Sequence, residues 1–203
     1  MAQPAAGVFP MFRPYARYVD FMGRSNRAEF WLFFLFNWIV GLVFIGSMAG
    51  MSMTNGHFDW DKFFPIYMRF APFLSLFNLA SFLPNLAVQV RRLHDITRSG
   101  WWIVAPMIVY IAAYIIFVIF NGQALIHTMT DMTDKMAQIG PASITPEAML
   151  KLEIPLLLMM APWVGIPSGV AYLFIMALWA LPGTPGPNRF GPGSNGGGTA
   201  DVF

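Results

Sequence analysis

RRLHDITRSGWW, residues 91–102, is the most charged stretch of this chain, and apolar sequence lies on both sides of it. It holds three arginines, a His-Asp pair and a Ser-Gly step that leads into two tryptophans. Buried strands and helices of soluble domains seldom carry so many charges. The stretch therefore predicts a short cytoplasmic turn between two membrane-spanning helices.

The composition is typical of a membrane protein. Of the 203 residues, 57% are hydrophobic and only 11% are charged, whereas soluble domains contain about 25% charged residues. The formal net charge of +2 is too small to indicate a nucleic-acid binder. Because cysteine is absent from the sequence, the chain offers no disulfide, thiolate nucleophile or zinc-thiolate site.

Four apolar segments are long enough to cross a bilayer, which takes roughly 20 residues of helix. They cover residues 30–51, 70–90, 101–120 and 154–181. We therefore expect an all-α, polytopic membrane protein with a four-helix transmembrane domain over residues 30–181. Residues 1–29 should form a cytoplasmic or interfacial segment. Residues 182–203, which are rich in Pro and Gly, should form a flexible cytoplasmic tail.

The distribution of Lys and Arg predicts the orientation, because positively charged loops are retained in the cytoplasm. With the N-terminus inside, the inner segments carry Arg13, Arg17, Arg24, Arg27, Arg91, Arg92, Arg98 and Arg189. The outer segments then carry only Lys62, Arg69, Lys135 and Lys151. Both termini should therefore lie on the cytoplasmic side.

The second span carries a row of polar residues, here called the polar stripe. It consists of Ser75, Asn78, Ser81, Asn85 and Gln89, which fall within about a 120° arc of a helix. Amides that face lipid lose their hydrogen bonds, so the stripe should face other helices or a wet cavity. Two uses remain open: hydrogen bonds between helices, or the lining of a small oligomeric transporter or channel.

Two segments outside the spans should lie at the membrane surface. PYARYVDFMGRSNRAEFW, before and into the first span, mixes aromatic residues with arginine, as segments in the headgroup region do. Residues 121–153 should form an outer loop with structure of its own. Within it, Met129, Met132 and Met136 have helical spacing, which predicts an amphipathic helix resting on the membrane.

Three motifs closely resemble the bacterial inner-membrane family catalogued as "domain of unknown function 805". They are GRSNRAEFW before the first span, RRLHDITRSGWW between the second and third, and GPNRFGP after the fourth. The resemblance implies a small multi-spanning protein of the bacterial inner membrane. The long outer loop departs from the family's pattern. Because the family has no settled activity, the resemblance implies no catalytic residues.

The motifs also predict an anion-binding face, since all three fall on the cytoplasmic side. Arginine forks match phosphate oxygens in pairs, so the face should bind anionic lipid headgroups or a phosphorylated or otherwise anionic partner. The arginines concerned are Arg24, Arg27, Arg91, Arg92, Arg98 and Arg189. The plainer alternative is that they set the topology and form ion pairs with Glu29 and Asp95.

Other motif residues have predicted structural roles. Asp95 or Ser99 should cap the third helix, and Gly100 should permit the turn before it. Trp31 and Trp101 should anchor their spans at the interface. His94 and Asn188 belong to the same motifs, and no role is predicted for either.

The sequence does not favour an enzyme. Intramembrane proteolysis would need acids or a histidine within a span, and phosphohistidine chemistry would need a second histidine on the side of His94. We therefore predict no catalytic residue, cofactor or metal. The expected role is structural or regulatory, with membrane lipids as partners, and homo-oligomers are compatible with it.

Overall fold

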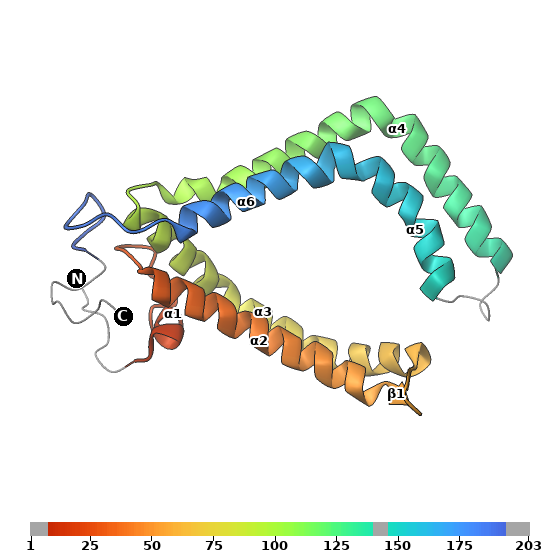
Figure 1. The fold of residues 1–203 in the computed structure, drawn as a ribbon, viewed down its shortest axis with the longest axis horizontal. Helices are drawn as coiled ribbons and strands as arrows, with labels where there is room; N and C mark the ends of the chain where they lie inside the picture. The colour runs from red at the N-terminus through yellow and green to blue at the C-terminus, as the bar shows by residue number, and fades with distance from the viewer. Residues whose placement is uncertain (1–7, 140–145, 194–203) are drawn as a thin grey trace. The chain divides into compact units, whose positions relative to one another are not determined.

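The computed structural model describes residues 8–139 and 146–193 and is mainly helical (Figure 1). Within those residues, four helical segments are long and apolar enough to cross a membrane: Arg27–Met51, Trp60–Asp95, Gly100–Gln138 and Leu150–Ala180. The prediction of an all-α polytopic membrane protein is thus confirmed.

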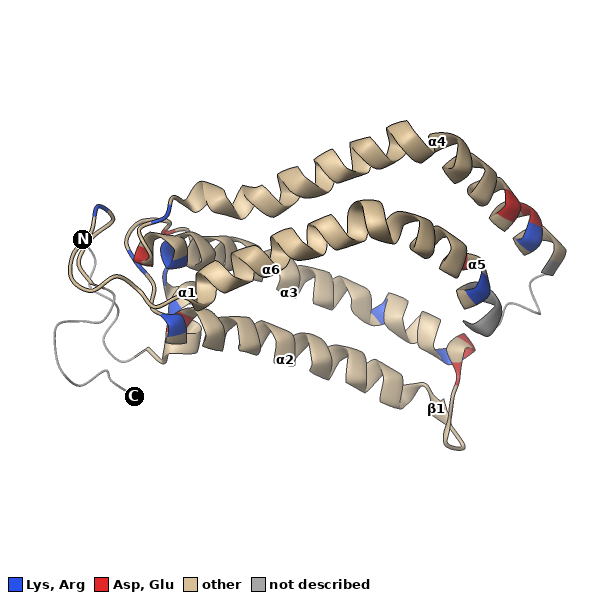
Figure 2. Cartoon of the chain, turned by 45° about the horizontal axis from the view of Figure 1, so that its top comes forward, with Lys and Arg blue, Asp and Glu red and all other residues tan. Residues whose placement is uncertain are grey.

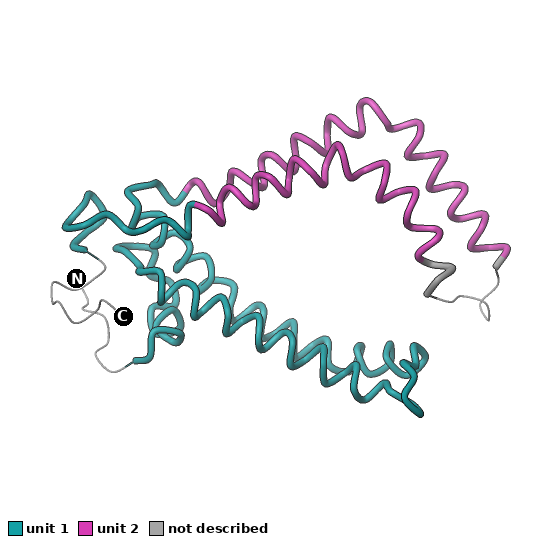
Figure 3. The backbone as a smooth tube through the Cα atoms, in the orientation of Figure 1, with its two compact units in different colours: residues 1–100, 178–203 teal, residues 101–177 magenta. Residues whose placement is uncertain are grey.

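The chain divides into two compact units (Figure 3). Unit 1 contains residues 1–100 and 178–203, and unit 2 contains residues 101–177. This division differs from the predicted one, which separated both terminal segments from the spans. Contacts in three dimensions join the described parts of those segments to the first two spans, and such long-range contacts leave no local signal in the sequence.

Unit 1 is built on a hairpin of two long helices that pack against each other. Its elements are η1 (Pro10–Phe12), α1 (Arg13–Ala16), α2 (Arg27–Met51), β1 (Met53–Thr54), β2 (His57–Phe58) and α3 (Trp60–Asp95). The antiparallel pair β1 and β2 joins the helices. Asn55 and Gly56 form its turn with φ of 51° and 79°, a left-handed conformation that an Asn-Gly pair tolerates.

α3 is longer than a membrane span requires. Its 36 residues extend about 54 Å at 1.5 Å per residue, against roughly 30 Å of hydrocarbon. The helix begins after Asp59, whose carboxylate accepts the backbone N–H groups of Asp61 and Lys62. It remains helical through three internal prolines. Both ends of α3 therefore project beyond the predicted span of residues 70–90.

Unit 2 is a second helical hairpin. Its elements are η2 (Gly100–Val104), α4 (Ala105–Ile139), α5 (Pro146–Met160), the π-helical turn η4 (Ala161–Gly165) and α6 (Ile166–Ala180), whose outermost residues belong to unit 1. α4 packs against α5 and η4, and the rings of Phe120 and Trp163 stack with centroids 6.1 Å apart.

The predicted outer loop over residues 121–153 is largely helical. α4 continues to Ile139 and α5 begins at Pro146, while residues 140–145 lie outside the described part. Polar side chains along this extension form hydrogen bonds and an ion pair within the same helix. Thr128 and Thr130 donate to carbonyls four residues earlier, and Lys135 pairs with Asp131 at 2.7 Å. Met129, Met132 and Met136, predicted to lie on a helix of their own, are part of the continuation of α4.

Candidate functional site

Asp95, the last residue of α3, holds its carboxylate between two arginines of unit 1. Arg24 Nε donates to Oδ1 at 2.8 Å, and Arg92 Nη1 donates to Oδ2 at 2.5 Å. None of the three side chains is more than 2% exposed. Charges buried this deeply are stable only when they are paired, so both arginines depend on one carboxylate.

A second buried ion pair joins the start of α2 to the same end of α3. Arg91 Nη2 donates to Glu29 Oε1 at 2.9 Å, with both side chains buried. The first turn of α2 is held in place by Asn26, whose side-chain oxygen caps the helix by accepting the Glu29 N–H at 2.8 Å. In addition, Ser25 N–H donates to the backbone carbonyl of Arg91. The two helix ends are thus locked together near the Asp95 cluster.

The chain that follows α6 is also part of this network. Residues 182–191, here called the strap, cross the end of α3. Thr184 N–H donates to the Asp95 carbonyl at 2.9 Å, and Arg24 donates to the carbonyls of Thr184 and Gly186. Arg92 donates to the Trp179 carbonyl just before the strap. Residues 182–191, predicted as part of a flexible tail, thus make defined contacts within unit 1, and residues 194–203 lie outside the described part.

The strap ends in a tight turn that rests on His94. Asn188 and Gly191 exchange two backbone hydrogen bonds of 2.9 and 3.0 Å. The Phe190 ring at the tip stacks on the His94 ring, with centroids 3.9 Å apart and planes 5° apart. His94 Nδ1 lies 3.1 Å from the Gly23 carbonyl, which only accepts, so Nδ1 carries the proton. His94 and Asn188, which donates to the His94 carbonyl, therefore fasten the strap.

The structure separates the six predicted anion-binding arginines into two groups. Arg24, Arg91 and Arg92, here called the buried arginines, donate to carboxylates and backbone carbonyls inside unit 1. Arg27, Arg98 and Arg189, here called the outer arginines, are exposed. Arg189 also donates to the Thr97 carbonyl and lies over the Phe190 ring at 4.6 Å. Among these six, the outer arginines are the ones with side chains at the surface (Figure 2 shows the charged residues near α1).

Charge is not balanced within the buried network. Its five side chains with a formal charge are Arg24, Arg91, Arg92, Glu29 and Asp95, and their sum is one positive charge. Asp20 lies close by, and its backbone carbonyl accepts from Arg91. Partial burial alone would raise the pKa of Asp20, but hydrogen bonds from Arg17 and Met22 hold that pKa below its ordinary value. Asp20 stays ionised and is paired with Arg17.

Two predicted local roles change in the structure. Asp95, one of the two predicted caps of the third helix, binds Arg24 and Arg92 through its two carboxylate oxygens. Gly100 does more than permit a turn, since a Cβ added there would lie 2.8 Å from Val90 Cγ1. Trp31 is half-buried against Phe30, and Trp101 is 80% exposed. Ser99, the other predicted cap, has an interaction partner in the structure.

The residues of the polar stripe have different surroundings in the structure. Ser81 is buried and its hydroxyl is 2.7 Å from the hydroxyl of Tyr15. Asn85 donates to the Ser81 carbonyl within α3. By contrast, Ser75 and Asn78 are exposed and Gln89 is half-buried. Tyr15 was missed from the sequence because its partner lies 66 residues away.

Residues 18–128, more than half of the chain, match the family model described as "Protein of unknown function (DUF805)". The chain belongs to the DUF805 family. This confirms the resemblance seen in the motifs. The DUF805 match includes both carboxylates of the buried network, whereas the strap lies beyond the matched residues.

Curated relatives of this DUF805 chain are inner membrane proteins. Inner membrane protein YhaH of Escherichia coli K12 is 35% identical over 111 residues, which cover 53% of this chain and 78% of YhaH. Inner membrane protein YhaI of the same strain is 37% identical over 106 residues, which cover 51% and 75%. No solved structure matches the chain. The DUF805 chain is thus an integral membrane protein of an inner-membrane family.

Proposed function

We propose that this protein is a structural or regulatory module of the inner membrane, without enzymatic activity, whose cytoplasmic face binds anionic lipid headgroups through the outer arginines. The observation that carries the proposal is the difference in burial among the six arginines, three of which are buried and three exposed. The buried arginines lock the helix ends and the strap into one frame. The side chains of the outer arginines are exposed at the surface of that frame, and guanidinium groups match the geometry of phosphate oxygens.

Local electrostatics support an anionic partner. Arg27 is the first residue of α2, and it is exposed beside the helix N-terminus. The first N–H groups of a helix lack intrahelical partners and carry partial positive charge. The Asn26 side chain accepts the Glu29 N–H. The excess positive charge of the buried network adds to the same field, which attracts anionic headgroups at the membrane surface.

Replacing all three outer arginines by glutamine should weaken lipid binding while leaving the fold intact. Each arginine near an anionic surface contributes about 1 kcal/mol, so affinity should fall on the order of 100-fold. Binding of a fluorescent phosphatidylglycerol to the protein in a neutral detergent would measure this. Raising the salt concentration should weaken binding by the wild type, because exposed charges are screened.

A matched variant removes the same number of exposed charges elsewhere: Lys62→Gln, Arg69→Gln and Lys135→Gln. It should bind phosphatidylglycerol as the wild type does. Equal losses in both triple variants would assign binding to net charge alone, and undiminished binding by the outer-arginine variant would refute the proposal. Competition by inorganic phosphate separates a free phosphate ligand from a lipid headgroup.

We also propose that both termini are cytoplasmic. In unit 1, one end of the α2–α3 hairpin carries the buried and outer arginines, and the other carries Lys62 and Arg69. Fusions of alkaline phosphatase and of green fluorescent protein to each terminus would test the orientation. We expect fluorescent, phosphatase-inactive fusions at both ends, because phosphatase matures only outside the cytoplasm. An active phosphatase at the C-terminus would contradict the proposed face, since the strap belongs to it.

A further inference from the structure

The N-terminal segment packs against the sides of the two spans of unit 1. The Tyr15 ring meets Phe33 edge-on at 5.1 Å, and the Phe12 ring meets Phe36 at 5.4 Å. The hydroxyl of Tyr15 also reaches Ser81 on α3. η1 and α1 thus bridge both helices.

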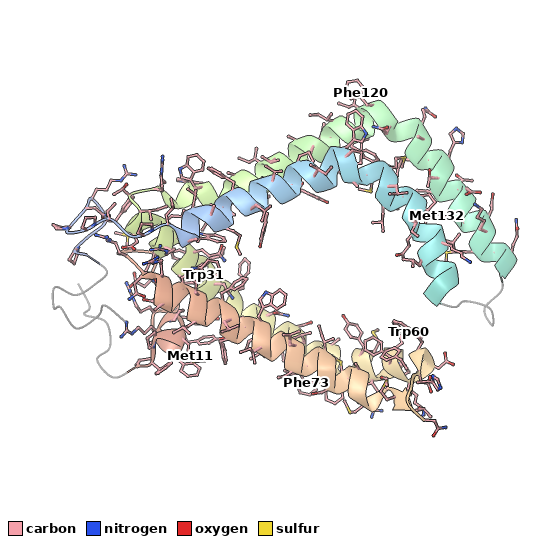
Figure 4. The ribbon with its side chains drawn as sticks, viewed as in Figure 1. Met11, Trp31, Trp60, Phe73, Phe120 and Met132 are labelled. Carbon is pink, nitrogen blue, oxygen red and sulfur yellow. The ribbon has the colours of Figure 1, made fainter. Side chains whose placement is uncertain are left out.

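These contacts lie well along the helices, away from the ion-pair network. Phe36 is seven residues beyond Glu29, or about 10 Å along α2 at 1.5 Å per residue. Ser81 is 14 residues before Asp95, or about 21 Å along α3. The headgroup region of one leaflet is only about 5–8 Å thick. With the network at the membrane surface, Tyr15 therefore reaches below the headgroups. Met11, in the same N-terminal segment, lies near the same end of α2 as Trp31 (Figure 4).

We infer that residues 9–17 insert among the lipid acyl chains of the cytoplasmic leaflet, beside α2 and α3. Phe9 is 62% exposed and Phe12 is 43% exposed. Phe12 packs against Phe36 of α2, and α2 itself presents exposed apolar side chains such as Leu35 and Ile39. Acyl chains are the partner that this surface fits, because the adjoining helix faces are themselves membrane spans. Interfacial segments commonly bury their apolar side about 5–10 Å deep.

The charged residues of the segment are compatible with that depth. Arg13 Nε donates to the Val8 carbonyl, and Arg17 pairs with Asp20 at 2.7 Å. Long arginine side chains place their stems along apolar surface while the charged group reaches toward water. The hydroxyl of Tyr15 gives Ser81 a hydrogen-bond partner where water is scarce. This insertion does not depend on the outer arginines.

Depth-dependent quenching would test the insertion. Because the chain has no cysteine, Phe9→Cys and Phe12→Cys each carry a single polarity-sensitive fluorophore. In nanodiscs of zwitterionic phosphatidylcholine, a nitroxide at carbon 5 of the acyl chain should quench both labels several-fold more than it quenches Pro187→Cys. Pro187 is an exposed residue of the strap and is the matched control. Anionic lipid is omitted so that headgroup binding does not affect the result.

Labels at positions 9 and 12 that are quenched no more than the label at 187, and that react equally fast with a charged maleimide, would overturn the inference. A second measurement uses Tyr15→Phe and Ser81→Ala. Each should lower the Tm in nanodiscs, and the double variant should lower it no further, because both remove the same hydrogen bond. Fully additive losses would show that Tyr15 and Ser81 are not coupled in the membrane.

Discussion

Asp95→Ala should destabilise unit 1 by about 3–5 kcal/mol, the usual cost of leaving a buried charge without its partner. The carboxylate serves both Arg24 and Arg92, whose side chains are 2% and 0% exposed. Its loss strands two cations inside the unit. The free energy of unfolding in nanodiscs, or in mixed micelles titrated with SDS, would measure the effect.

Asp20→Ala is the matched control for this variant. It removes a carboxylate of the same size from an ion pair with Arg17 in which the side chains are 24% and 38% exposed. Partly exposed pairs contribute about 0–1 kcal/mol, so the loss should be small. Similar losses for the two aspartates would contradict the conclusion that Asp95 stabilises unit 1 by pairing with two buried arginines. Asp95→Asn should fall between them, because it retains the shape but not the charge.

Gly183→Ala should be nearly as damaging, although glycine to alanine is a small change. A Cβ at position 183 would lie 2.7 Å from the carboxyl carbon of Asp95 and still closer to Oδ2. The carboxylate cannot turn aside without leaving its two arginines. Overpacking alone costs about 1–3 kcal/mol, and weakened buried pairs add to it. We expect a loss of roughly 3 kcal/mol or more in the same unfolding measurement.

Two controls isolate the steric cause. Gly46 lies within α2 and has no atom within 4 Å of an added Cβ, so Gly46→Ala should keep or raise stability by up to about 1 kcal/mol. Combined with Asp95→Ala, Gly183→Ala should cost little more, because the clashing carboxylate is gone. Additive losses in that double variant would show that position 183 acts independently of Asp95.

Several features could be read from the residues because their signals are local. Apolar runs of sufficient length identify four spans whatever their partners. The Asn-Gly pair at residues 55–56 is also a local turn signal, although the turn between β1 and β2 was not among the predictions. The exact helix ends were less accessible, since residues 121–139 continue α4 through local hydrogen bonds that hydropathy does not register.

The candidate site was only partly predictable. The motifs led to Arg24, Arg91 and Arg92 as predicted anion-binding residues, whereas the structure buries all three in ion pairs. Ion pairs with Glu29 and Asp95 had been kept as the plainer alternative. Which arginine is buried was not foreseeable, because guanidinium groups at a membrane surface look alike in sequence. The roles of Tyr15 and Gly183 depend on contacts 66 and 88 positions along the chain.

The sequence by itself determined that this is a membrane protein with four predicted spans, and it determined the family. The spans follow from apolar composition, because the bilayer core selects apolar side chains, and the family follows from short motifs. Only the tertiary structure showed that residues 91–102, predicted as a turn, also hold the helix ends and the strap together through Asp95. Asp95 contacts Arg24 and the strap, which are remote in sequence. Because these contacts bury its carboxylate, the charge of Asp95 stabilises the fold instead of being solvated.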